Sequence, residues 1–557
     1  MGETIKITLA IILMILICIL IDYLLNIKRL NKNKISIINN YGKEIEVEDS
    51  SYKMESISSY FRNKNKKGII DDITWSDLSM DDIFKKINNS QSTVGNEVLY
   101  YILRNPLKNN NELIKRDNII EYFAKSEKER IDLQLLFSRL GYNYDLNTTL
   151  CLFMDEDKSK NKLNLYRFLR ALPIISIALI GVNKSFAFIT LLLVCLNIFI
   201  SFNNKKSKVD VSGFSYIIKV VNLAFKIKSK NLNIINENMN DISNDLQQVK
   251  KIKKKSISTN PNSMLSDLNV LSEYTKMIFL SELITYEKVK ETIIKNKEYL
   301  KNIYEYVGTV DALIAVASFR ESLEYYSKPQ LFISNDKSEN LIDFVDLYHL
   351  LVKKPISNSL SARDGILITG SNASGKSTFI KSVAINQILG QTIFTTCAKS
   401  YKASFFNIYT SMALKDDVLK NESYYIVEIK SLKRIIDKSN DKIPMLCFVD
   451  EILRGTNTIE RIASSSEVLN YFNDSNCVCF AATHDIELTY LLENKFDNYH
   501  FEEEITDNDI VFDYHLKSGR AKSRNAIKLL ALMGYDDKII EDANKKAEQF
   551  VTTGKWK

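Results

Sequence analysis

The nine residues GSNASGKST at positions 370–378 constrain the fold more than any other feature of the chain. They fit the pattern G-x-x-x-x-G-K-[ST] and directly follow a short apolar run that ends at Thr369. Such a loop works between a buried strand and a helix, because its backbone N–H groups and the positive helix end then face a phosphate. The pattern therefore predicts an α/β P-loop ATPase domain, with a strand over 366–369 and a helix over 377–389.

The loop residues have separate predicted roles in binding ATP and Mg²⁺. Glycine at 370 and 375 lets the backbone turn toward the phosphates, Lys376 reaches the β- and γ-phosphates, and the Ser377 hydroxyl ligates Mg²⁺. The predicted nucleotide-binding residues are Gly370, Ser371, Asn372, Ala373, Ser374, Gly375, Lys376, Ser377 and Thr378.

Two later apolar runs end in residues that suit phosphate chemistry. Met445–Val449 is followed by Asp450, which we expect to hold Mg²⁺, and by Glu451, which we expect to orient the attacking water. The next run ends before His484, one of only 4 histidines in the chain. His484 is either a structural histidine or a sensor of the γ-phosphate, and its place at a strand end favours the sensor.

Two long apolar segments predict membrane attachment. Residues 7–27 have the length of a bilayer span, and basic residues cluster after them, at Lys28, Arg29, Lys32 and Lys34, which favours a retained anchor over a cleaved signal. A second block, 169–202, is broken near Gly181 and has basic residues on both flanks. We expect about three spans in the cell membrane with the ATPase domain in the cytoplasm. A buried or re-entrant helical pair is the alternative for 169–202.

Only 6 Pro and 16 Gly occur in 557 residues, so helix should dominate outside the ATPase domain. A net charge of +7 permits nucleic acid or anionic lipid as a partner and requires neither. The basic run Lys250–Lys255 is a solvated helix face or a contact for phosphates. The expected order is a transmembrane anchor (1–27), a polar linker (28–70), an all-α lever (71–168), a transmembrane hairpin (169–202), the rest of the lever (203–340) and the ATPase domain (341–557).

Three of these motifs together resemble the MutS family of ABC-type ATPases. They are Gly370–Thr378, Asp450–Thr458 (DEILRGTNT) and Ala482–His484 (ATH). The chain has Ser371, Ala373 and Ser374 where that family usually has Pro, Met and Gly. Weaker similarities are found at Thr93–Arg116, Pro355–Asn358, Ser423–Ile429 and Ser518–Ala543.

The resemblance implies a homodimer with composite sites, in which Ser423 of one subunit reaches the γ-phosphate bound by the other. ATP would join two ATPase domains, and hydrolysis would release them and move the helical levers. We expect no mismatch-reading domain, because residues 28–70 are too short for one. Two hypotheses stay open: a DNA clamp at the membrane that contacts phosphates, or the same ATPase acting on a membrane or protein partner without DNA. A conventional ABC transporter is disfavoured, since the chain has no L-S-G-G-Q signature.

Overall fold

The computed structural model describes most of the chain, in two compact units. The described residues are 21, 24–25, 28–45, 53–64, 70–144, 147–154, 162–203, 205–250, 275–371, 374–412, 424–439, 441–505, 510–521 and 526–553. Most of the predicted anchor lies outside them, as do Asn372, Ala373, Ser423 and 251–255. The first unit comprises Met1–Lys67, Ile87–Tyr101 and Lys115–Ser322, and the second comprises Gly68–Lys86, Ile102–Ile114 and Leu323–Lys557.

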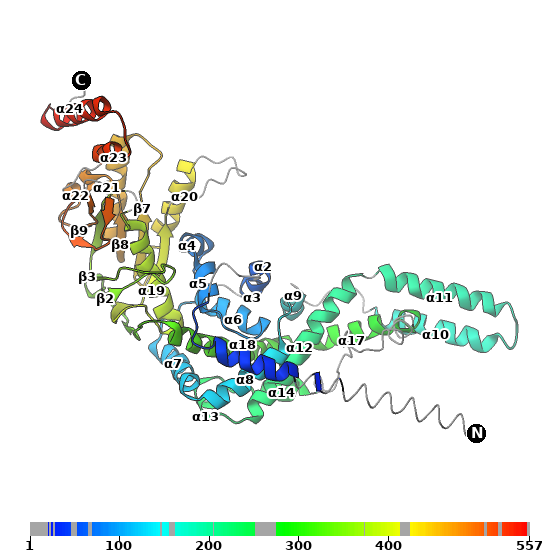
Figure 1. Cartoon of the computed structure of the whole chain (residues 1–557). Helices are drawn as coiled ribbons and strands as arrows, with labels where there is room; N and C mark the ends of the chain where they lie inside the picture. Colours follow the sequence, from blue (N-terminus) through cyan, green and yellow to red (C-terminus); the bar gives the residue numbers. More distant parts are fainter. Residues whose placement is uncertain are drawn as a thin grey trace. The chain divides into compact units, whose positions relative to one another are not determined.

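The described part of the first unit is helical (Figure 1). It contains all or part of α2 (Met54–Ile57), α3 (Ser59–Asn63), α6 (Thr93–Arg104), α7 (Asn110–Lys125), α8 (Glu127–Leu140), α9 (Asn147–Phe153), α10 (Leu163–Leu179), α11 (Phe186–Asn203), α12 (Lys205–Ser229), α13 (Asn233–Asn238), α14 (Ser243–Gln248), α17 (Ser281–Lys295) and α18 (Lys297–Ser322).

Helices α6 and α18 approach closely because each has a glycine at the contact. A Cβ atom on Gly308 would lie 2.4 Å from Val98 Cγ2, and one on Gly95 would lie 2.2 Å from Asp311 Oδ2. Neither side can take a larger residue without separating the helices. The contact therefore depends on glycine at both positions.

Two carboxyl groups are fully buried beside this contact. Glu97 accepts hydrogen bonds from the hydroxyls of Tyr304 (2.7 Å) and Thr149 (3.0 Å). Asp311 accepts a hydrogen bond from the Ser92 hydroxyl at 2.5 Å. Burial disfavours the charged form and raises the pKa of Glu97 to about 8 and that of Asp311 to about 7. Both carboxyls therefore keep their protons to a higher pH than they would in water.

Residues 163–203 form an antiparallel helical hairpin of α10 and α11 (Figure 1). The Ser176 and Thr190 hydroxyls are 2.8 Å apart across the pair. Asn197 Nδ2 donates to Leu169 O at 3.2 Å and to Ile278 O, just before α17, at 2.9 Å. These three polar side chains therefore lie between helices, whereas Arg167, Arg170 and Lys184 are exposed.

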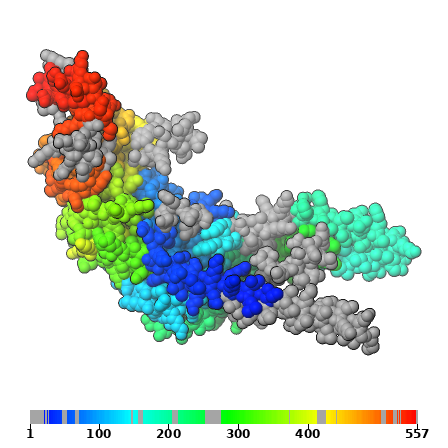
Figure 2. All heavy atoms as spheres, viewed as in Figure 1, coloured from blue at the N-terminus to red at the C-terminus, as the bar shows by residue number. Residues whose placement is uncertain are grey.

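The outer face of the hairpin is apolar and exposed, and Figure 2 shows it uncovered on the side in view. Its exposed side chains include Leu165, Phe168, Ile174, Ile175, Ile177, Val182, Phe188, Leu191, Leu192, Phe199 and Phe202. Among the described residues, α11 is the one helix long and apolar enough to cross a membrane. The alternative of a pair buried inside the protein does not fit these exposures, whereas membrane insertion stays a prediction.

The second unit is built on a six-stranded sheet with the order β12-β9-β4-β8-β7-β6. Its strands are β4 (Gly365–Thr369), β6 (Asn407–Ser411), β7 (Met445–Asp450), β8 (Cys477–Ala482), β9 (Phe496–His500) and β12 (Lys517–Ser518). All neighbours pair in parallel except β12 with β9. β4, β7 and β8 are almost wholly buried, as expected of a parallel sheet covered on both faces.

Smaller sheets and helices complete this unit. A four-stranded sheet consists of β1 (Gln330–Phe332), β2 (Ile342–Leu347), β3 (Asn358–Ala362) and β5 (Ser400–Ser404), and a hairpin of β10 (Glu503–Ile505) and β11 (Ile510–Phe512). The helices are α4 (Asp72–Asp77), α5 (Met80–Ile87), η2 (Lys337–Glu339), α19 (Lys376–Ile393), α20 (Tyr424–Ile436), α21 (Thr458–Asp474), α22 (Ile486–Leu491), α23 (Ala526–Leu532) and α24 (Asp537–Thr553). A mixed α/β fold after a helical region agrees with the sequence-based expectation.

We predict that Glu97→Gln makes the protein more stable at high pH. The folded state holds a proton on Glu97 up to about pH 8, whereas a glutamate in the unfolded chain releases its proton near the ordinary pKa of 4.5. The contribution of Glu97 to stability is therefore complete below pH 4.5 and is lost as pH rises through 8, by up to about 1.4 kcal/mol per pH unit. Glutamine keeps the hydrogen-bonding shape and cannot ionise.

The measurement is the Tm of the detergent-solubilised variant and wild type between pH 5.5 and 9. The difference in Tm should grow with pH in favour of the variant. Glu298→Gln, an exposed glutamate of α18 paired with Lys301, is the matched control and should give a difference independent of pH. A flat difference for Glu97→Gln as well would show that Glu97 is ionised in the folded protein.

Candidate functional site

The site forms where three neighbouring strands end. β8 pairs in parallel with both β4 and β7, so their carboxyl ends meet at one edge of the sheet. Gly370 follows β4, Glu451 follows β7, and His484 comes two residues after β8. Ligands of parallel α/β sheets bind outside the carboxyl ends of the strands. The fold thus brings together the three motifs that the sequence analysis identified.

The phosphate-binding loop leads from β4 into α19. Gly370 has φ +146° and Gly375 has φ +104°, values that disfavour any side chain. A Cβ on Gly375 would also lie 3.0 Å from the Tyr514 ring. Ser371 donates its hydroxyl hydrogen to Glu503 at 2.7 Å, which ties the loop to β10.

Lys376 lies across the loop and is only 5% exposed. Its Nζ donates to the carbonyl oxygens of Gly370 and Ser371, both at 2.8 Å, and lies 3.4 Å from His484 Nε2. Burial lowers the pKa of Lys376, partly offset by the nearby Asp450, Glu451 and Glu503 carboxylates. An anionic ligand at this position would favour the charged ammonium.

Asp450 and Ser377 suit a magnesium ion. Burial raises the pKa of Asp450, and a hydrogen bond from the Ser377 hydroxyl opposes that shift. The two side chains therefore present a carboxylate and a hydroxyl oxygen next to each other. Among the described residues no group of three or more His, Cys, Asp and Glu side chains forms a metal site. Magnesium at a nucleotide needs only one or two protein ligands, because phosphates and water supply the others.

Glu451 is held by two basic side chains. Its Oε1 lies 2.9 Å from His484 Nε2, and its Oε2 lies 2.5 Å from Arg454 Nη1. Its backbone has φ +53°, and its N–H donates to Ala482 O at 2.9 Å. The backbone conformation thus turns the carboxylate out of the strand and toward the loop.

Glu428 also supports the site, by a contact that was not predicted from the sequence. This buried carboxylate of α20 accepts the backbone N–H of Leu453, a residue at φ +57° in the loop after Glu451. Burial raises the pKa of Glu428. Its position inside the stretch Ser423–Ile429, which resembles a family signature, was the one feature of the sequence that could have indicated this role. Ser423 itself lies outside the described residues.

A second support lies beside His484. Asp485 forms a two-point ion pair with Arg461 of α21, at 2.9 Å to Nε and 2.6 Å to Nη2. A paired guanidinium and carboxylate fix each other's orientation. The Arg461–Asp485 pair therefore fixes the backbone that presents His484.

A cavity of about 530 Å³ opens beside the loop. The phosphate-binding loop and Glu451 line one part, and residues 347–358 with Tyr514 line the rest. Burial lowers the pKa of His349 in this wall to about 4, and its Nδ1 accepts the N–H of Leu351 at 3.2 Å. The cavity is large enough for more than a phosphate group, and its far wall is largely apolar.

Comparisons with known proteins find MutS proteins in two ways. Residues 366–551 match the family model of MutS domain V. The chain is 29% identical over 283 residues to the DNA mismatch repair protein MutS of Bacillus velezensis, covering 48% of this chain and 31% of that protein. It is 30% identical over 300 residues to the MutS of Rickettsia akari, covering 50% and 33%. It is 28% identical over 282 residues to the human MutS protein homolog 4, covering 48% and 30%.

The aligned part spans about a third of the length of these relatives. The matched residues contain the phosphate-binding loop, Asp450, Glu451 and His484. Residues 366–551 of this chain are therefore similar to domain V of the MutS family.

Proposed function

We propose that the second unit binds ATP with Mg²⁺ and hydrolyses it to ADP and phosphate. The observation that carries the proposal is the meeting of Lys376, the Asp450–Ser377 pair and the Glu451–His484 pair at one edge of the sheet. The phosphates would lie on the loop, and the rest of the nucleotide would extend along the cavity toward His349 and Tyr514.

Lys376 changes partners when phosphates bind in this scheme. Its ammonium leaves the carbonyl oxygens of Gly370 and Ser371, which hold it now, and donates to phosphate oxygens instead. Ser377 and Asp450 would hold Mg²⁺, which supplies neutralising charge to the phosphates. The negative charge of the ligand offsets the burial that lowers the pKa of Lys376.

Glu451 orients the attacking water and accepts its proton as the oxygen attacks the γ-phosphorus. Arg454 and His484 hold the two oxygens of Glu451, so the carboxylate has a defined direction. His484 lies within reach of both Glu451 (2.9 Å) and Lys376 (3.4 Å), and so lies between the water and the γ-phosphate in this arrangement. It senses the γ-phosphate in this scheme.

The similarity to MutS proteins supports two further parts of the proposal. The active form is a homodimer in which Ser423 of one subunit contacts the nucleotide of the other. DNA, mismatched or branched, binds through its phosphates in this proposal. Two of the relatives are named DNA mismatch repair proteins, which supports a DNA ligand. Nucleotide turnover then moves the helical levers.

The exposed apolar hairpin supports a place at the cell membrane, with the ATPase unit in the cytoplasm. Eleven or more large apolar side chains on α10, α11 and their turn would otherwise face water, which is unusual for a soluble monomer. The same observation favours a second candidate function. In it, the ATPase acts on a membrane or protein partner and needs no DNA.

We predict that Lys376→Ala and Glu451→Gln fail at different steps. Lys376→Ala removes the phosphate contact and should weaken ATP binding by at least about tenfold. Glu451→Gln keeps the binding residues but cannot take the proton, so kcat should fall by about 10²-fold or more while ATP still binds and the dimer persists. Equilibrium binding of a fluorescent ATP analogue, steady-state hydrolysis and size-exclusion chromatography measure these effects. Hydrolysis by Glu451→Gln at the wild-type rate would refute the role of Glu451.

DNA dependence separates the two candidate functions. A DNA clamp should show an ATPase rate stimulated by DNA, and the stimulation should fade between low and high salt because phosphate contacts release counterions. The measurement compares homoduplex, mismatched and branched DNA at two salt concentrations with solubilised wild-type protein. A robust basal rate that no DNA alters would favour the membrane or protein partner.

We predict that Cys195 of α11 is shielded by lipid. This thiol is exposed in the structure, so water would reach it if the hairpin lay outside a bilayer. In membrane vesicles a charged maleimide should leave Cys195 unlabelled, as read by mass spectrometry, until detergent or denaturant is added. Val182→Cys is the matched control, because Val182 lies in the turn between the two helices and is 82% exposed. Its thiol should be labelled when the reagent is on the side of the membrane opposite the ATPase unit. Rapid labelling of Cys195 in intact vesicles would refute insertion.

A further inference from the structure

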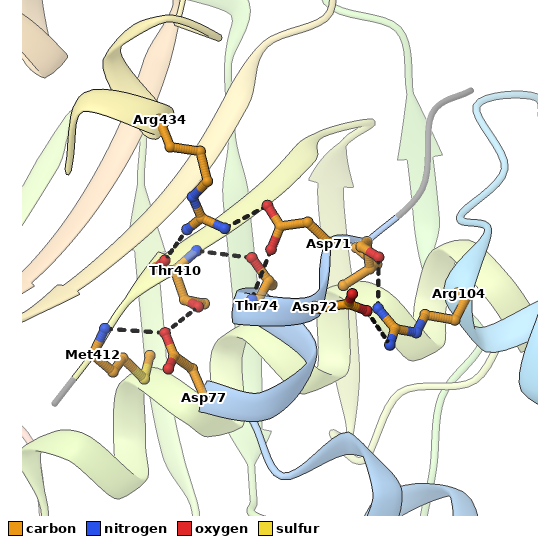
Figure 3. Close-up of polar contacts among 9 residues, drawn as sticks. Asp71, Asp72, Thr74, Asp77, Arg104, Thr410, Met412 and Arg434 are labelled. Carbon is orange, nitrogen blue, oxygen red and sulfur yellow. Dashed lines mark hydrogen bonds and ion pairs between the residues drawn. The ribbon is translucent and has the colours of Figure 1, made fainter. Parts of the chain in front are cut away.

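The helix α4 covers the open edge of the ATPase sheet (Figure 3). β6 is the last strand of that sheet, so backbone groups on its outer side need partners elsewhere. The N–H groups of Thr410 and Met412 donate to Thr74 Oγ1 at 3.3 Å and to Asp77 Oδ2 at 3.1 Å. The Thr410 hydroxyl donates to Asp77 Oδ2 at 2.7 Å. Side chains of α4 thus stand in for a missing strand.

Arg434 of α20 joins the same cluster (Figure 3). Its guanidinium donates to Asp71 Oδ2 and to the carbonyl oxygen of Thr410, and lies 5.9 Å from the Tyr409 ring centre. Asp71 has a second role, because its Oδ1 accepts the N–H of Thr74 at 2.8 Å and caps α4. One carboxylate therefore both starts α4 and holds Arg434.

Arg434 joins two elements that support the nucleotide site, because it belongs to α20 and donates to β6. α20 carries Glu428, which holds the loop after Glu451 through the N–H of Leu453. β6 pairs with β7, where Thr410 lies opposite Phe448, two residues before Asp450. A displacement of Arg434 would therefore reach the Mg²⁺ ligand through β7 and the catalytic carboxylate through α20.

The far side of α4 is also fixed. Arg104 donates to Ile70 O at 2.9 Å and to Asp72 Oδ1 at 2.7 Å, and its guanidinium stacks 4.3 Å from the Trp75 ring centre. Arg104 ends α6, a helix that is continuous back to Thr93. α4 therefore connects the end of a long helix to the supports of the ATPase site.

We propose that Arg434, held by Asp71, is a positioning residue for ATP hydrolysis, and that α4 passes movement between α6 and the nucleotide site through this pair. The proposal rests on the ATPase function proposed above and names a route by which hydrolysis moves helices. Arg434 touches no substrate atom and acts through Glu428 and β6.

The test is Asp71→Asn in the full-length protein. Asparagine is as good an N-cap as aspartate, so α4 keeps its start. The ion pair is lost, since an amide facing the guanidinium has no charge and presents donor hydrogens. We expect kcat for ATP to fall by about tenfold, within the range of coupling effects in such networks, while the dissociation constant of a fluorescent ATP analogue changes by less than about twofold.

Three further variants make the outcome specific. Arg434→Gln should reproduce the loss of kcat, and the double variant should be no worse than either single one, because the two residues act as one unit. Lys433→Gln removes the neighbouring cation of α20, which pairs with Asp437 and not with α4, and should keep the wild-type kcat.

The proposal is overturned if Asp71→Asn keeps the wild-type kcat, or if kcat and nucleotide affinity fall together with the Tm, which would mean a purely structural role. Failure of the ATPase assignment looks different. In that case the wild type would not hydrolyse ATP, or Lys376→Ala would match it, whatever the state of Asp71.

Discussion

The parallel pairing of β4, β8 and β7 is the constraint on which the candidate nucleotide site depends. Parallel strands need crossover connections, so α19 and α21 must lie over the sheet, and the strands become apolar on both faces. The first polar residues after each strand are then forced to one edge. That edge gathers Gly370, Asp450, Glu451 and His484 although 114 positions separate the first from the last. The order and direction of the strands therefore bring the candidate site residues together, and the side-chain contacts only refine their positions.

This dependence explains which parts of the site could be predicted from the sequence. The loop, Asp450–Glu451 and His484 follow short apolar runs, so strand pattern and local motif were sufficient to place them together. The role of Glu428 was not predicted. It depends on the turn at Leu453, and no local sequence pattern indicates the positive φ of that residue. The contact of Asp71 with Arg434 could not be predicted either. The two residues are 363 positions apart, and charged residues of this kind usually lie on the surface, so the sequence does not indicate that they pair.

The same distinction holds in the helical unit. The low Pro and Gly content predicted helices. The close approach of α6 and α18, however, depends on Gly95 and Gly308, and glycine is by itself a poor helix former. That approach also buries Glu97 and Asp311, where burial raises the pKa of both carboxyls. In the structure, Gly68–Lys86 and Ile102–Ile114 belong to the same unit as the six-stranded sheet. The cause is tertiary: the open edge of β6 takes its partners from α4.

The hairpin of α10 and α11 shows how polar groups can be reconciled with an apolar exterior. Ser176, Thr190 and Asn197 have their partners between the helices, so most of the outer face of α10 and α11 presents apolar side chains. In lipid an unsatisfied amide costs several kcal/mol, so Asn197 is stable there only while it keeps its carbonyl partners. One of those partners, Ile278 O, precedes α17 rather than belonging to the hairpin. Separating the hairpin from α17 would therefore expose a polar group in an apolar setting, and this cost ties any movement of α17 to movement of the hairpin.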